Sequence, residues 1–151
     1  KGLCAVNPFQ SLRNYEDFIY NLPSTYPFVV YTTLVVVRHS ARQATVTGEV
    51  AFADAYRLVV SERLDFADEF ITIRHYGYEV WHGKEKLYWY DSQAHPNDPI
   101  LASTHPHHKH VPPDIKHNRI PASGLSFTQP NLPFLIQEIG ALLVDPDATA
   151  T

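Results

Sequence analysis

Histidine is concentrated in one stretch of this 151-residue chain, and that stretch is where chemistry is expected. Five of the nine histidines lie between residues 105 and 117, and His95 follows Asp91 by four residues. Histidine gives and takes protons near neutral pH, and a neighbouring carboxylate can fix its tautomer and raise its pKa. The residue types and their spacing therefore predict acid–base chemistry between Asp91 and His117.

The predicted catalytic set joins the carboxylate to the histidines of this stretch: Asp91, His95, His107, His108 and His110. His107 and His110 are the preferred base and acid, with Asp91 as the group that orients them. Such a set could cleave RNA with the substrate's own 2′-hydroxyl as nucleophile, and it needs no metal or other cofactor.

Basic residues follow the histidines closely. Lys109, Lys116 and Arg119 are expected to bind a phosphate or to stabilise the charge of a pentavalent transition state. They give the segment from residue 105 to 120 a local positive charge, although the chain as a whole carries a net charge of −4. This end of the chain is the better place for an anionic ligand.

A metal site is one alternative reading of the same stretch. His105, His107 and His110 could offer three imidazoles to zinc. Their spacing matches no strong zinc motif such as H-E-x-x-H, and the stretch contains no cysteine. A further alternative is a solvated loop whose histidines have no catalytic role and which docks on a partner protein.

Arg74 and Tyr78 are candidate contacts for an RNA base. Period-two alternation places both on one strand face together with Tyr76, and a sheet face that carries tyrosine and arginine can stack bases. Cross-strand aromatic packing is the simpler explanation for most rings of this segment. The isolated His75 and His82 are expected to be structural.

Two helices are expected, one near each end of the chain. The first runs from about Phe9 to Tyr20, with Asn7 as N-cap, Pro8 at the first helical position and Pro23 ending it. The second runs from Asn131 to about Leu143 and carries a clear apolar stripe. This stripe is expected to pack on one face of the sheet.

Five strands lie between the helices, at residues 28–38, 44–52, 56–64, 70–81 and 85–90. Short turns join them, so the sequence predicts an antiparallel meander and an α+β fold with one domain over residues 1–151. The first strand is almost continuously apolar and is expected to be central.

The segment after the last predicted strand is rich in proline. Residues 92–133 contain eight of the chain's twelve prolines. Proline removes backbone donors, so neither a sheet strand nor a long helix is expected there. Residues 91–130 are therefore predicted to form a long ordered loop with a functional role.

Composition excludes several classes of protein. No segment approaches the roughly 20 apolar residues of a membrane helix, and no chain-wide basic patch is present. Cys4 is the single cysteine, so an internal disulfide cannot form, and a cytoplasmic protein is expected.

The pair Tyr90-Asp91 and the run Pro106-His107-His108-Lys109-His110 resemble the TumE family of toxins from bacterial toxin–antitoxin modules. In that family a strand ends in an aromatic–Asp pair, a linker carries histidine and a Pro-His-His-Lys/Val-His run follows. The resemblance covers roughly residues 46–110. The chain departs from the family at Gln93-Ala94-His95-Pro96, where a histidine pair is more common.

The resemblance implies a cytoplasmic toxin that acts on RNA and pairs with a DNA-binding antitoxin. The positions that match its motif are Asp91, His95, His107, His108, Lys109 and His110. The leading hypothesis is a metal-independent ribonuclease toxin. A homodimer is a possible assembly, and no membrane partner is expected. A non-catalytic binding module and a metal-dependent hydrolase are the alternatives.

Overall fold

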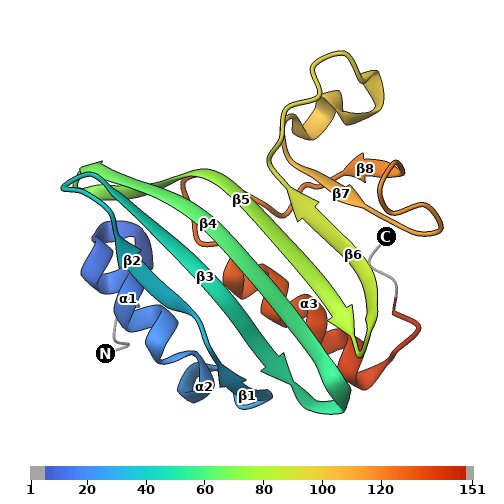
Figure 1. Cartoon of the computed structure of the whole chain (residues 1–151), viewed down its shortest axis with the longest axis horizontal. Helices are drawn as coiled ribbons and strands as arrows, with labels where there is room; N and C mark the ends of the chain where they lie inside the picture. The colour runs from blue at the N-terminus through green and yellow to red at the C-terminus, as the bar shows by residue number, and fades with distance from the viewer. Residues whose placement is uncertain (1–5, 149–151) are drawn as a thin grey trace, which may run out of the picture.

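Eight antiparallel strands form one sheet, and helices from both ends of the chain cover one of its faces (Figure 1). This computed structural model describes residues 6–148, so Cys4 lies outside the described part. The α+β class, the single antiparallel sheet and the two terminal helices are confirmed. The sheet has eight strands where the sequence predicted five, and the strand order is β1-β3-β4-β5-β6-β7-β8 with β2 also paired to β3.

The first predicted helix is divided in two by its own capping residues. A 3-10 turn, η1 (Pro8–Gln10), precedes helix α1 (Leu12–Tyr20). Asn7 caps η1, as its predicted role as an N-cap requires. Ser11 is extended, with φ −157°, and its hydroxyl accepts a hydrogen bond from the amide of Asn14 at 3.0 Å. A second N-cap inside the apolar pattern thus restarts the helix.

Pro23 begins a helical turn and does not end one. Helix α1 stops at Tyr20, and the short helix α2 (Leu22–Thr25) carries Pro23 in its first turn. Proline is tolerated there because the first amides of a helix have no intrahelical acceptor.

The first predicted strand is two short strands at the sheet edge. Strands β1 (Val29–Thr32) and β2 (Val35–Arg38) pair with opposite ends of β3. The break between them packs against Gly48, where an added Cβ would lie 2.6 Å from the carbonyl oxygen of Thr33. The prediction of a central strand is wrong, because β1 and β2 each pair with β3 alone and so lie at the edge of the sheet, although the run is apolar.

The middle of the sheet follows the predicted meander. Its strands are β3 (Gln43–Phe52), β4 (Tyr56–Asp68), β5 (Phe70–His82) and β6 (Glu85–Asp91). The 3-10 turn η2 (Ala53–Ala55) joins β3 to β4.

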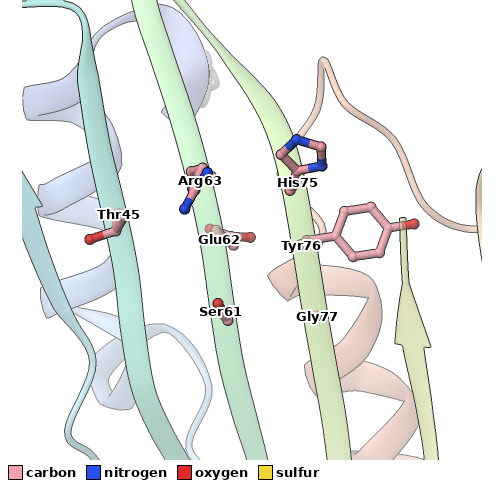
Figure 2. Close-up of a pocket in the computed structure, with 7 residues that line it drawn as sticks. All are labelled: Thr45, Ser61, Glu62, Arg63, His75, Tyr76 and Gly77. Atoms are coloured by element: carbon pink, nitrogen blue, oxygen red, sulfur yellow. The ribbon is translucent and has the colours of Figure 1, made fainter. Parts of the chain in front are cut away.

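One face of the sheet is the core and the other is open. Helices α1 and α3 (Leu132–Val144) lie on the same side of the strands (Figure 2). Glu62 is buried on that side, where it accepts hydrogen bonds from the hydroxyls of Tyr15 on α1 and Tyr78 on β5. Alternate residues of the same strands therefore point away from the helices, onto what we call the outer face.

Two strands form inside the proline-rich segment, where none was expected. They are β7 (His108–His110) and β8 (Arg119–Pro121), and the 3-10 helix η3 (Pro99–Thr104) precedes them. The prolines flank these short strands or occupy their ends, so the pairing of β7 with β6 is uninterrupted. Within residues 6–148, no helix has both the length and the apolar character needed to cross a membrane.

Candidate functional site

Alternation along β7 divides the histidine run between the two faces of the sheet. His108 pairs with Asp91 of β6, and His110 pairs with Trp89. These positions share the outer face, whereas Lys109, between them, points to the helix-covered face. The strand pairing therefore brings two of the predicted histidines to the predicted carboxylate.

Asp91, His108 and His110 form one compact cluster, which we call the Asp–His–His cluster. The Nε2 atom of His108 lies 3.0 Å from Oδ1 of Asp91, and Nε2 of His110 lies 3.1 Å from Oδ2. The two Nε2 atoms are 3.1 Å apart. The side chains of His108 and His110 are only 1% and 4% exposed, but that of Asp91 is 26% exposed. Asp91 is thus the member of the cluster that solvent or a ligand reaches.

Backbone carbonyls fix which nitrogen of each histidine faces the carboxylate. Nδ1 of His108 lies 3.0 Å from the carbonyl oxygen of Pro106, and Nδ1 of His110 lies 2.8 Å from that of Ile115. A carbonyl only accepts, so each Nδ1 carries the proton that it donates. In the neutral rings both Nε2 lone pairs then converge on a carboxylate that also only accepts. A shared proton or another cation must occupy this contact.

His108 is the favoured holder of that proton. Burial by itself lowers the pKa of His108, but the hydrogen bonds with Asp91 and with the carbonyl of Pro106 and the negative charge of Asp91 together more than offset it, so the pKa lies above its ordinary value. Burial lowers the pKa of His110 below its ordinary value. Although burial favours the neutral acid, the hydrogen bonds of Asp91 with His108 and with the amide of Gln93 lower its pKa. The cluster therefore holds a carboxylate and an imidazolium beside a neutral imidazole.

His95 and Arg119 complete the site. The ring of His95 lies edge-on to that of His108, with 4.9 Å between the ring centres. Burial, and then the positive charge of Arg119, lower the pKa of His95. Arg119 is the strand partner of His110, and its Nε atom is buried without a hydrogen-bond partner among the described residues. A neutral, partly exposed imidazole and a guanidinium thus border the cluster.

His107, the preferred base of the sequence prediction, lies on the other face. Its Nδ1 contacts the hydroxyl of Tyr76 at 2.5 Å, and its ring packs 4.6 Å from that of Phe127. His107 and His110 therefore lie on opposite faces of the sheet, so the structure does not bring this predicted base and acid together.

Lys109 is a core residue and Lys116 is remote. The ammonium of Lys109 lies 3.9 Å from a carboxylate oxygen of Glu138 on α3 and 4.0 Å from the ring centre of Tyr88. With a side chain 5% exposed, Lys109 is not a phosphate contact. Lys116 is exposed in the turn between β7 and β8, and no contact joins it to the cluster.

Tyr78 and Arg74 do not form a stacking surface. Tyr78 is completely buried and bonded to Glu62, so no ring face is open to a base. Arg74 is exposed at a bulge, where the register between β4 and β5 shifts, and it pairs with Asp65 at 3.4 Å. The bulge changes the parity of β5, so Arg74 does not share the face of Tyr76 and Tyr78.

The predicted zinc ligands are not gathered in one place. His105 is exposed in the loop before β7, and His107 and His110 face opposite sides. Among the described residues, the group whose metal-binding atoms lie within 4.8 Å of one another is Asp91, His108 and His110. The structure thus moves the metal alternative onto the Asp–His–His cluster.

A hollow that the sequence did not predict lies beside the cluster. A depression of about 220 Å³ on the outer face borders Asp91 and Trp89 and is floored by Gly77. Gly77 interrupts a strand of large residues, which is a known sign of a close approach by a ligand or another backbone. That signal was present in the sequence.

A comparison with protein-family models agrees with the family that the sequence resembles. The family model described as Toxin TumE matches residues 17–143, which include the end of α1, the whole sheet and nearly all of α3. No curated protein and no solved structure matches the chain. The family match contains every residue of the Asp–His–His cluster, and the chain belongs to the TumE toxin family.

Proposed function

We propose that this toxin cleaves RNA by metal-independent acid–base chemistry at the Asp–His–His cluster and His95. The observation that carries the proposal is the contact of Asp91 with His108 and His110 on the open face of the sheet, beside a hollow. Two titratable groups whose environments push their pKa values apart are the usual basis of an acid and a base in one site. His108 and His95 are such a pair.

His95 is the proposed base. It is neutral near pH 7 and more exposed than His108, so it can take the proton of the 2′-hydroxyl. The oxygen then attacks the adjacent phosphorus, and the bond from phosphorus to the 5′-oxygen breaks. The products are a 2′,3′-cyclic phosphate and a 5′-hydroxyl.

We propose that the proton held between His108 and Asp91 is transferred to the leaving 5′-oxygen. Asp91 borders the hollow, so this proton lies at the edge of the space that a substrate could fill. Nε2 of His110 lies 3.1 Å from Nε2 of His108 and 3.1 Å from Oδ2 of Asp91, so neutral His110 borders the shared proton and can accept it from His108. Arg119 supplies positive charge for the phosphorane.

A toxin of this kind implies an antitoxin that neutralises it. We propose that the antitoxin also binds DNA, as the resemblance to toxin–antitoxin modules suggests. Its binding would have to cover Asp91 and His95 or change the pairing of β6 with β7, because those features build the proposed centre.

A metal-dependent hydrolase is the second candidate, and one observation favours it. Two Nε2 lone pairs and a carboxylate converge, with both Nδ1 atoms anchored to carbonyls, and such anchoring is typical of histidines that bind metals. A divalent cation could replace the shared proton.

Cleavage of RNA by the purified chain tests both candidates. Asp91→Asn and His108→Gln are compared with His117→Gln, an exposed histidine in the turn after β7. The acid–base proposal expects cleavage that survives chelation with EDTA, is lost in the first two variants and leaves a 2′,3′-cyclic phosphate. Cleavage that stops with EDTA and returns with one metal would support the hydrolase. Growth arrest that persists in His108→Gln would support a non-catalytic binding module.

A further inference from the structure

The outer face has a row of small side chains that leads to the proposed reaction centre and that the proposed chemistry does not use. Strand register places Thr47, Ser61, Gly77 and Asp91 in one row across β3, β4, β5 and β6, and His108 of β7 continues it. The first three are small, and the last two belong to the Asp–His–His cluster. The row is therefore a trough that ends at the proposed reaction centre.

Two hollows mark this trough. The hollow beside Asp91 shares Ser61 and Gly77 with a larger one of about 380 Å³. Figure 2 shows the larger hollow, with Ser61 and Gly77 side by side on β4 and β5 and with Arg63 and His75 further along the same strands. A Cβ added to Gly77 would meet no atom within 4 Å, so the missing side chain leaves real space.

The charges around the trough favour an anion. Glu79 borders it on the Trp89 side, but its carboxylate pairs with Lys86 at 3.4 Å and accepts the indole proton of Trp81 at 2.9 Å. Arg63 is exposed at the other end, and it forms no ion pair within residues 6–148. The other two acids that line the hollows also have partners, since Asp91 pairs with His108 and buried Glu62 accepts hydrogen bonds from Tyr15 and Tyr78. The cation Arg63 is therefore the charged side chain that is available to a ligand.

The distances suit a chain-like ligand. Strands lie about 4.8 Å apart and rise about 3.4 Å per residue, so Arg63 and Asp91, two strands and two residues apart, are separated by about 12 Å. A short oligonucleotide can span that length with one phosphate at each end.

We propose that this trough binds the backbone of a single RNA strand next to the bond to be cleaved, with Arg63 and His75 contacting a phosphate remote from the reaction. The inference rests on the proposed ribonuclease function and adds a substrate-binding site to it. It also gives His75, predicted to be structural, a role in binding.

Binding of a fluorescein-labelled 2′-O-methyl oligouridylate tests the trough without cleavage, because the probe has no free 2′-hydroxyl. Gly77→Val fills the space, Gly77→Ala fills less of it, and Arg63→Ala removes the cation. Arg13→Ala on α1 is the matched control, since it removes the same charge from the helix side. Thermal unfolding of each variant verifies the fold.

We expect Gly77→Val and Arg63→Ala to weaken binding by about tenfold and about fivefold, with Gly77→Ala intermediate and Arg13→Ala unchanged. Arg63→Ala should also lower the slope of log affinity against log salt by about one. If Gly77→Val does not fold, Arg63→Ala and its salt slope decide the result.

A parallel assay on unmodified RNA separates the two proposals. If the wild type cleaves RNA but all variants bind the probe equally, the trough is refuted and the ribonuclease stands. If the wild type binds the probe, with the expected losses, but cleaves no RNA, the trough stands as a nucleic-acid site and the ribonuclease is refuted. A wild type that neither binds nor cleaves refutes both.

Discussion

The Nε2 atom of His108 lies 3.0 Å from Oδ1 of Asp91, which joins the first residue of β7 to the last residue of β6. We predict that Asp91→Asn lowers the pKa of His108, because the hydrogen bond and the negative charge that raise it are both lost while burial remains. NMR titration of the imidazole signals measures this change. A pKa for His108 that stays the same in Asp91→Asn would contradict the proton-sharing contact.

The same substitution at two adjacent histidines should affect RNA cleavage very differently. His108→Gln is expected to reduce RNA cleavage by about 100-fold or more, the usual contribution of a general acid. His107→Gln should leave cleavage within about threefold of wild type, because its ring lies against Tyr76 and Phe127 on the other face. Initial rates on one RNA, with thermal unfolding as the fold control, make the comparison.

The pH dependence of cleavage should be bell-shaped. The pKa of His95 is lowered, so the base becomes neutral and the rate rises as the pH increases through that pKa. The pKa of His108 is raised, so the acid loses its proton and the rate falls as the pH passes that higher value. Rates measured across neutral pH test the shape. In Asp91→Asn, any residual activity should show its alkaline limb at lower pH, whereas an unmoved limb would exclude His108 as the acid.

Lys109 should matter for stability and not for catalysis. Lys109→Met keeps the apolar stem but leaves the carboxylate of Glu138 without its cation, and loss of one partner of a buried pair costs about 3 kcal/mol of unfolding free energy. Lys116→Met, on the exposed turn, should change it by less than about 0.5 kcal/mol. Urea unfolding compares the two variants.

The double variant Lys109→Met with Glu138→Gln is the control for that explanation. Removing both charges should restore much of the lost stability, since no uncompensated buried charge remains. A double variant as unstable as Lys109→Met would show that the apolar packing around Tyr88 was the cause.

Local patterns predicted the helices and the hairpins of the sheet, because periodicity and turn residues report short-range structure. They also grouped Asp91, His95, His108, His110 and Arg119, which the structure places close together. They could not separate His107 from His108, because that distinction depends on the phase of β7, which is fixed only by pairing with β6. The prolines around this three-residue strand led to the prediction of a loop, so the pairing of β7 with β6 was not predicted.

Arg74 and Ser11 also show that residue spacing alone does not predict side-chain direction where the backbone is irregular. Alternation put Arg74 on the face of Tyr78, but a bulge opposite β4 shifts the parity. Apolar spacing carried one helix through Ser11, but its side chain caps a new one. In both cases a single backbone irregularity, which leaves no mark in hydrophobic spacing, decides where side chains point.

The alternation of β7 has a consequence for how the gene can change. His108, Lys109 and His110 face outward, inward and outward, and each is buried. Loss or gain of one codon between Pro106 and His108 would slide the strand by one residue, which would place an ammonium beside Asp91 and two imidazoles among the tyrosines of the core. Single-codon insertions and deletions there should therefore abolish toxicity and folding together, whereas substitutions can separate them.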